Sequence, residues 1–127
     1  MLALQFDFNS EIPIYMQIAR QLEDAIFIGV YPEESQIPST TELSVSLQIN
    51  PATVLKGMNI LVDGGIIYKK RGLGMFVTEG AVEIIKNKRQ SGFFENFILP
   101  LKAEAKKLGL SEKDIVELIE RGDKNEH

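Results

Sequence analysis

Residues 38–78 read PSTTELSVSLQINPATVLKGMNILVDGGIIYKKRGLGMFVT. The stretch predicts, in order, a short helix, a tight turn, a second helix and a two-stranded hairpin with a basic tip. Each piece is common by itself, so the specific signal is the order of the pieces. That order is typical of a winged helix-turn-helix, in which the second helix enters the major groove of DNA and the hairpin, or wing, lies beside it against the backbone.

Both helices of this stretch have recognisable N-terminal caps. Ser39 and Glu42 form the S-x-x-E pattern of a capping box, which predicts a helix over residues 40–47. Only a turn fits between this helix and the next. Asn50 is a favourable N-cap, and Pro51 suits the first helical position, where its missing N–H costs nothing. The second helix is therefore expected to begin there and to end near the following Asp-Gly-Gly.

The second helix has one apolar face and one exposed face. Its buried stripe is expected to be Val54, Met58, Leu61 and Val62. Thr53 and Lys56 would then face outward, with Asn50 and Ala52 at the tip, where a recognition helix reaches base edges or phosphates. Two simpler interpretations stay open: Asn50 is only the cap, a role compatible with DNA contact, and Lys56 is only a solvated charge.

The hairpin is expected to have strands at residues 66–70 and 75–78, joined by residues 71–74. Gly72 and Gly74 suit a tight turn. They would also let the backbone approach DNA closely, and the sequence does not separate these two roles.

The tip of the hairpin is basic. Lys69, Lys70 and Arg71 predict a phosphate clamp or a minor-groove arginine, although such a run is commonly just a solvated patch. Strand alternation is expected to place Lys70 on the face opposite Lys69 and Arg71. A nucleotide-binding phosphate loop is disfavoured, because the GK[ST] ending and the following helix are both missing.

Helical patterns flank the decisive stretch on both sides. An amphipathic helix is expected over residues 12–29, and a second helical pattern begins at residue 79. Gly92 and Pro100 interrupt that pattern and predict a kink or break near one of them. A cap at Ser111 begins a last helix, which is expected to end near residue 121.

The expected fold class is therefore α+β and mostly helical, a winged helix-turn-helix followed by a C-terminal helical dimerisation hairpin. The DNA-binding domain is expected over residues 1–79. The dimerisation region is expected over residues 80–127, with a disordered tail.

Composition excludes several classes of function. The chain has 127 residues, of which 44% are hydrophobic and 25% charged, as in an ordinary globular protein. It has no cysteine, and its single histidine is His127, so disulfides, thiolate metal sites and a histidine-based triad are not expected. We expect no catalytic residue, no metal and no cofactor. No apolar run is long enough for a membrane span and the N-terminus is unlike a secretory signal, so a cytoplasmic location is expected.

The net charge of −4 is unevenly distributed along the chain. Residues 1–49 have one basic and seven acidic residues, a net charge of −6. Residues 50–90 have seven basic and three acidic residues, a net charge of +4. The positive block coincides with the second helix, the hairpin and the segment after it. Because local charge decides where a polyanion docks, this block is the expected DNA-binding part.

An aromatic cluster lies in the C-terminal region. Phe93, Phe94 and Phe97, with Leu101 one turn further on, exceed what a short helical hairpin can bury alone. One interpretation is packing between the last two helices. The stronger one is a homodimer interface, since helix-turn-helix readers generally use two copies for two half-sites.

Residues 12–78 resemble the DNA-binding domain of the GntR family of bacterial transcription regulators. The resemblance rests on PIYMQIARQL, IPSTTEL and RGLGMFV, which are fairly specific together. The short C-terminal part and the Asn-Pro-Ala-Thr-Val opening of the second helix are similar to the YtrA-type subfamily, which dimerises through two helices and lacks a large effector domain.

The resemblance implies a repressor that binds a pseudo-palindromic operator as a homodimer and controls its own operon and a neighbouring ABC transporter. It implies DNA contacts at Ser39, Thr40, Asn50, Ala52, Thr53, Lys56, Arg71, Gly72 and Gly74. Thr41 stands where the family often has arginine, and Leu55 where it often has a basic residue. Fewer arginines mean fewer bidentate contacts with guanine, so binding is expected to be weaker or more dependent on DNA shape.

The sequence leaves three questions open at this point. The module could be a winged-helix interaction unit that does not bind DNA, which the acidic first helix and the few arginines favour slightly. The sequence does not distinguish a repressor from an activator. It also leaves open whether a small-molecule effector exists.

Overall fold

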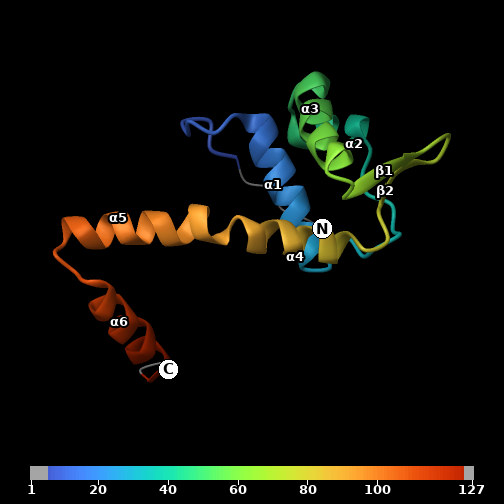
Figure 1. Ribbon diagram of the computed structural model, residues 1–127. Coiled ribbons are helices and arrows are strands. Elements are labelled where there is room, and N and C mark those ends of the chain that lie inside the picture. Colours follow the sequence, from blue (N-terminus) through green and yellow to red (C-terminus); the bar gives the residue numbers. More distant parts are fainter. Residues whose placement is uncertain (1–5, 125–127) are drawn as a thin grey trace. The chain divides into compact units, whose positions relative to one another are not determined.

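The computed structural model describes residues 6–124 (Figure 1). The chain divides into two compact units, Met1–Asn87 and Lys88–His127. The first contains α1 (Ile14–Phe27), α2 (Thr40–Leu47), α3 (Pro51–Asp63), β1 (Ile67–Lys70), β2 (Gly74–Val77) and most of α4 (Ala81–Ser91). The second contains a π-helical segment (Phe94–Ile98), α5 (Leu99–Lys107) and α6 (Glu112–Lys124). The fold is mostly helical with one small antiparallel sheet, as predicted. None of the helices within residues 6–124 combines the length and the apolar character that crossing a membrane requires.

The core of the first unit lies between α1, α3 and the hairpin. Its buried side chains recur every three or four residues on the two helices: Ile18, Leu22 and Ile26 on α1, and Val54, Met58 and Leu61 on α3. Each such side chain contributes about 1.5–3 kcal/mol of hydrophobic stabilisation. Val62, which was expected in the buried stripe, is only half-buried at its margin.

Glycine allows α1 and α3 to pack closely. A Cβ atom on Gly57 would lie 2.7 Å from the carbonyl oxygen of Tyr15 and 3.2 Å from the Cβ of Ile18. Neither neighbour is a flexible side-chain end that could move aside. The distance between the two helices is therefore set by the missing side chain at Gly57.

The predicted caps of α2 and α3 are confirmed. The Ser39 hydroxyl accepts a hydrogen bond from the Glu42 N–H at 3.0 Å, and the Glu42 carboxylate accepts one from the Ser39 N–H at 3.1 Å. The side chain of Asn50 accepts the Ala52 N–H at 2.8 Å. In the turn between the helices, the Ser44 hydroxyl donates to the Ile49 carbonyl at 2.7 Å. The start of each helix is therefore fixed by side-chain hydrogen bonds that the sequence already indicates.

The hairpin is antiparallel, with Ile67 opposite Val77 and Lys70 opposite Gly74. The segment before α2 runs along the other edge of β2. Its backbone N–H groups at Glu34 and Ile37 donate to the carbonyls of Val77 and Met75 at 2.8 and 2.9 Å. The segment around Gln36 therefore adds an isolated β-bridge and backbone hydrogen bonds to the two-stranded wing, which local sequence patterns did not indicate.

The first unit extends past the boundary expected at residue 79, because Ala81 and Ile85 of α4 are buried in its core. The Glu33 carboxylate holds the start of α4 by accepting the N–H groups of Gly80 and Val82 at 2.7 and 3.1 Å. These two hydrogen bonds stabilise the ionised form and lower the pKa of Glu33, against the smaller opposing effect of desolvation.

The irregularity expected near Gly92 or Pro100 is present: α4 ends at Ser91, next to Gly92, and a π-helical turn at Phe94–Ile98 lies before Pro100. The Leu99 N–H donates to the Phe94 carbonyl five residues earlier, and the backbone on both sides of this turn stays helical. Pro100 has no N–H to donate, so a wider turn just before it accommodates the proline without interrupting the helix.

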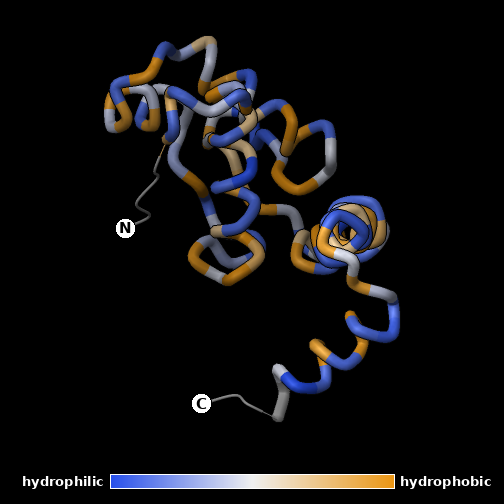
Figure 2. The backbone as a smooth tube through the Cα atoms, turned by 90° about the vertical axis from the view of Figure 1, so that its left-hand side faces the viewer, coloured by the Kyte–Doolittle hydropathy of each residue, from blue (hydrophilic) through white to orange (hydrophobic). Residues whose placement is uncertain are grey.

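The second unit ends in the amphipathic helix α6, along which apolar and hydrophilic residues alternate (Figure 2). Its predicted cap is present: the Asp114 N–H donates to the Ser111 hydroxyl and the Ser111 N–H to the Asp114 carboxylate. An ion pair of 3.1 Å joins Lys102 of α5 to Glu112 of α6. The helix continues to Lys124, past the end expected near residue 121. Residues 125–127 of the expected disordered tail lie outside the described residues.

Candidate nucleic-acid interface

The outward face of α3 is formed by residues at helical spacing opposite the buried stripe. These are Ala52, Leu55, Lys56 and Asn59, all exposed. Thr53, which was expected to face outward, is half-buried at the edge of this face. Leu55 and Asn59 were not among the predicted contacts, although their spacing of three and seven residues from Ala52 could have indicated them. The exposed face therefore offers one charge, one amide and two apolar side chains.

The single cation of this face is held by α1. The Nζ of Lys56 lies 4.1 Å from the centre of the Tyr15 ring. Such a contact at an exposed site is worth about 0.5–1 kcal/mol. The lysine can still rotate towards a phosphate, because that cost is small. Its resting position is nevertheless set by the aromatic side chain of another helix.

The polar side chains at the start of α2 are engaged within the chain. The Ser39 hydroxyl is the cap of the helix, and the Thr40 hydroxyl lies 3.4 Å from the sulfur of Met58 on α3. Asn50 likewise uses its side-chain oxygen as the cap of α3. All three have structural roles, and for Asn50 this is the simpler of the two interpretations made from the sequence. Asn50 is exposed and Ser39 and Thr40 are half-buried, so these structural roles leave all three residues at the surface.

The two faces of the wing differ in chemistry. Tyr68 stacks on Phe76 with ring centres 6.1 Å apart, and the Nζ of Lys70 lies 4.7 Å above the Phe76 ring. Lys69 pairs with Met75 in the register and therefore has the opposite face, as strand alternation predicted. The cations of the wing are thus distributed over both of its faces.

The tip of the wing is a tight turn. The Leu73 N–H donates to the Lys70 carbonyl at 2.9 Å, and Gly72 has a φ of +78°, which a side chain would disfavour. Arg71, Gly72 and Leu73 are all exposed. In Figure 1 the hairpin projects from the helices of the first unit with this turn at its outer end. A backbone so placed can approach a polyanion without steric hindrance.

The predicted DNA contacts thus fall in three places of the first unit. Ser39 and Thr40 lie at the start of α2. Asn50, Ala52, Thr53 and Lys56 lie in the first two turns of α3. Lys69, Lys70, Arg71, Gly72 and Gly74 lie in the wing. Within residues 6–124 there is no group of three or more side chains of the kinds that ligate metals.

The aromatic cluster of the second unit is exposed in the single chain. Phe93, Phe94 and Phe97 are each more than half exposed, and the rings of Phe93 and Phe97 lie 5.2 Å apart. Leu101 is 41% exposed. Among the described apolar residues of this unit, only Ala105 is buried. The unit therefore does not bury its own apolar face.

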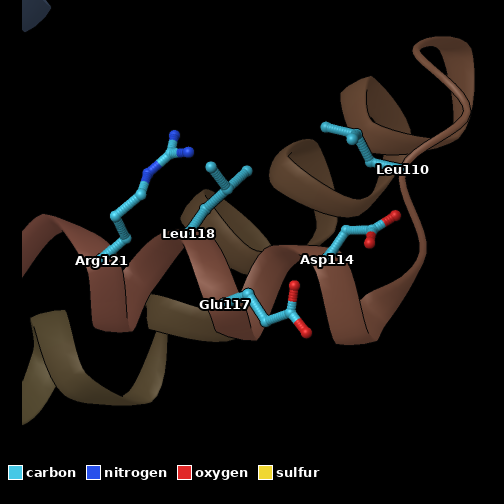
Figure 3. Close-up of a pocket in the computed structure, with 5 residues that line it drawn as sticks. All are labelled: Leu110, Asp114, Glu117, Leu118 and Arg121. Atoms are coloured by element: carbon cyan, nitrogen blue, oxygen red, sulfur yellow. The ribbon is translucent and has the colours of Figure 1, made fainter.

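In the described part of this unit, three hollows lie along α5 and α6, and two of them bear on this apolar face. One, of about 270 Å³, lies between α5 and α6 and has leucine and isoleucine walls, including Leu108 and Ile119. The other, of about 350 Å³, combines Leu110 and Leu118 with the charged Asp114, Glu117 and Arg121 (Figure 3). Figure 3 shows these charged side chains along α6 with Leu110 on the segment before it. In this second hollow, apolar side chains of the unit meet charged side chains of α6.

Known proteins are similar to this chain in both sequence and fold. Residues 14–77 match the family described as bacterial regulatory proteins, gntR family. The chain is 31% identical over 118 residues to YhcF of Bacillus subtilis, an uncharacterized HTH-type transcriptional regulator, and the match covers 88% of this chain and 91% of YhcF. A stretch of 78 residues is 36% identical to YtrA of Bacillus subtilis, an HTH-type transcriptional repressor, and covers 61% of this chain and 60% of YtrA.

Solved structures agree with the family match. A putative transcriptional regulator of the GntR family from Bacteroides thetaiotaomicron is 33% identical, with a TM-score of 0.74 over 90% of this chain and 99% of that one. The DNA-binding domain of AraR in complex with an operator is 29% identical, with a TM-score of 0.51 over 58% of this chain and 92% of that one.

Proposed function

Because the chain belongs to the GntR family of bacterial regulatory proteins and is of the YtrA type, we propose that it is a transcription repressor that binds a pseudo-palindromic operator as a homodimer. The relatives are transcription regulators and not enzymes. The operator lies in the cytoplasm, where the protein would act. No cofactor and no metal enter this proposal.

The observation that carries the proposal is the exposed face of α3 beside a projecting basic wing. α3 would lie in the major groove, where Thr53 and Lys56 would read the groove with Asn50 and Ala52 at its edge. The exposed Leu55, beside Lys56, would add an apolar contact with base edges. Ser39 and Thr40, at the start of α2, would approach the sugar–phosphate backbone of the DNA.

The wing would supply most of the electrostatic attraction. Arg71 would contact DNA at the turn, Lys69 or Lys70 would contact phosphates, and Gly72 and Gly74 would let the backbone come close. α3 has a single lysine, which rests on Tyr15, so the helix itself contributes little charge. Affinity would therefore depend on salt mainly through the wing.

The homodimer would form through the second unit. The exposed rings of Phe93, Phe94 and Phe97, with Leu101 beside them, make an apolar surface that a monomer would leave in water. A second copy with the same surface would cover it in a two-fold arrangement. Two DNA-binding units would then read two half-sites about one helical turn, or a multiple of it, apart.

The test is a titration of the protein onto DNA from upstream of its own gene, with a scrambled duplex as control, at several salt concentrations. A repressor predicts preference for its own promoter and a negative slope of log affinity against log salt. Removing one phosphate-contacting lysine should reduce the slope by about one unit. Equal, weak binding to both duplexes would overturn the operator proposal.

A second candidate is a winged-helix unit that binds a protein partner. The contact between Lys56 and Tyr15 favours this second candidate, because the contact occupies the one positive charge that α3 could offer to DNA. The same titration distinguishes the two candidates, since an interaction unit would bind neither duplex with a preference.

A further inference from the structure

The side chain of Gln36 reaches from the segment before α2 to the turn of the wing. Its Nε2 donates to the carbonyl oxygen of Leu73 at 2.7 Å, across 37 residues of sequence. The backbone of Gln36 forms an isolated antiparallel bridge with Phe76 of β2. The backbone of Gln36 is therefore fixed beside β2, and its side-chain amide reaches the turn that follows β1.

The local sequence makes room for this amide at Gly74. A Cβ atom on Gly74 would lie 2.7 Å from Nε2 of Gln36, and the φ of Gly74 is +123°. Because the amide is the end of a flexible side chain, a Cβ could push it aside, but the hydrogen bond to Leu73 would then be lost. The structure thus gives Gly74 a role that the sequence left open, namely space for the side chain of Gln36.

The hydrogen bond fixes the peptide between Leu73 and Gly74, which closes the wing turn. On its inner side the turn is held by the Leu73 N–H to the Lys70 carbonyl. The Gln36 amide is the second, independent constraint, and it comes from outside the hairpin. Three residues after Gln36 the capping box of α2 begins at Ser39, so one short segment joins the wing to the helix-turn-helix.

We propose that Gln36 is a positioning residue of the DNA interface, which holds the wing turn in the orientation that presents Arg71 to DNA. The inference rests on the proposed function, since it assigns how the wing of that interface is ordered. A glycine-flanked turn held at one side only would be mobile, and DNA binding would have to order it. Gln36 would remove that cost before DNA arrives, without touching DNA itself.

The test uses Gln36→Met in the full chain, because methionine has a similar length and no hydrogen-bond donor. Gln90→Met on the exposed part of α4 is the matched control. In the free protein, the ¹⁵N heteronuclear NOEs of the Gly72 and Gly74 amides should fall in Gln36→Met and stay unchanged in the control. The urea unfolding midpoint should fall only slightly in Gln36→Met, because one intramolecular hydrogen bond is lost, and should be unchanged in the control. Affinity for the protein's own promoter should fall about three- to tenfold in Gln36→Met only, the size expected from one hydrogen bond.

A double-mutant cycle with Arg71→Ala separates positioning from direct contact. In the Arg71→Ala background, Gln36→Met should cost much less affinity, because the side chain that it positions is gone. A full, additive loss in that background would mean that Gln36 contacts DNA itself and would overturn the inference. Unchanged NOEs at Gly72 and Gly74 would also overturn it.

These readouts distinguish failure of the inference from failure of the proposed function. If the wild-type protein shows no preference for its own promoter, the proposed function fails together with the DNA part of the inference. If the wild type binds selectively and Gln36→Met binds equally well, only the inference fails.

Discussion

The ammonium of Lys56 on α3 lies 4.1 Å from the centre of the Tyr15 ring on α1. The only basic side chain of α3 is therefore held by the helix against which α3 packs. Because Tyr15 and Lys56 are far apart along the chain, no local sequence pattern indicates that they are in contact. Their contact explains how an outward-facing lysine can have a defined position before any partner binds.

The contact predicts a measurable coupling between the two side chains. Lys56→Met and Tyr15→Leu should each lower the free energy of unfolding, and together they should show a coupling of about 0.5–1 kcal/mol in urea denaturation. Lys69→Met combined with Tyr15→Leu is the control pair and should be additive. Additivity in both pairs would mean that the cation–π contact does not form in solution.

The exposed side chain of Leu55 predicts readout of a thymine methyl group. Replacing single thymines of the selected operator by deoxyuridine removes one methyl each, and at one position this should reduce affinity about fourfold, the effect of about 0.8 kcal/mol. In Leu55→Ala the same replacement should have little effect. Val45→Ala, at an exposed valine of α2, should leave the deoxyuridine effect as in the wild type. If no thymine position depends on Leu55, this readout is wrong.

Gly57→Ala should destabilise the first unit, although alanine is the better helix former. The added Cβ would lie 2.7 Å from the Tyr15 carbonyl oxygen, and such overpacking costs about 1–3 kcal/mol, which exceeds the gain of about 1 kcal/mol in helix propensity. We expect a net loss of up to about 2 kcal/mol by urea denaturation. Gly122→Ala on α6 meets no atom within 4 Å and is the matched control, expected to be neutral or slightly stabilising. Equal stability of the two variants would contradict this packing.

Glu33 predicts a pH dependence of stability. The N–H groups of Gly80 and Val82 lower the pKa of Glu33 in the folded protein below its unfolded value of about 4.3. The ionised carboxylate therefore stabilises the fold above the unfolded pKa, and this contribution is lost as the pH falls through the folded pKa. The melting temperature of Glu33→Gln should lie below that of the wild type at pH 7, and the difference should shrink below pH 4.

The neighbouring Glu34→Gln is the control for this measurement, since it makes the same chemical change in the same loop. Its difference from the wild type should not follow the pattern of Glu33→Gln. A difference for Glu33→Gln that stays constant from pH 7 to pH 3 would show that the carboxylate does not hold α4 through its charge.

Phe97→Asp should convert the protein to monomers in sedimentation equilibrium. Phe97 is 62% exposed in the single chain, and a charge in the centre of a shared apolar surface would have to be desolvated in a dimer. Val45→Asp places the same charge at an exposed apolar residue of the first unit and should leave the assembly unchanged. A dimer that persists in Phe97→Asp would place the interface elsewhere.

Much of the DNA-binding unit follows from local signals in the sequence. The capping box of Ser39 and Glu42 and the Asn50–Pro51 start of α3 act within one helical turn, so they operate in any context that permits a helix. The wing is likewise indicated by glycines whose positive φ suits its turn. The same local reasoning placed Lys69 and Lys70 on opposite faces, because strand alternation is a property of the backbone.

The sequence by itself therefore determined the order of the elements, their caps and the basic wing, since these depend on hydrogen bonds and spacings between near neighbours. Tertiary structure decided which distant side chains hold the elements of the first unit: Tyr15 contacts Lys56, Gln36 donates to the Leu73 carbonyl, and Glu33 accepts a hydrogen bond at the start of α4. It also extended the first unit to Asn87 and decided that the expected irregularity near Gly92 and Pro100 takes the form of a π-helical turn. These contacts join residues far apart in the chain or depend on packing, so no local pattern encodes them.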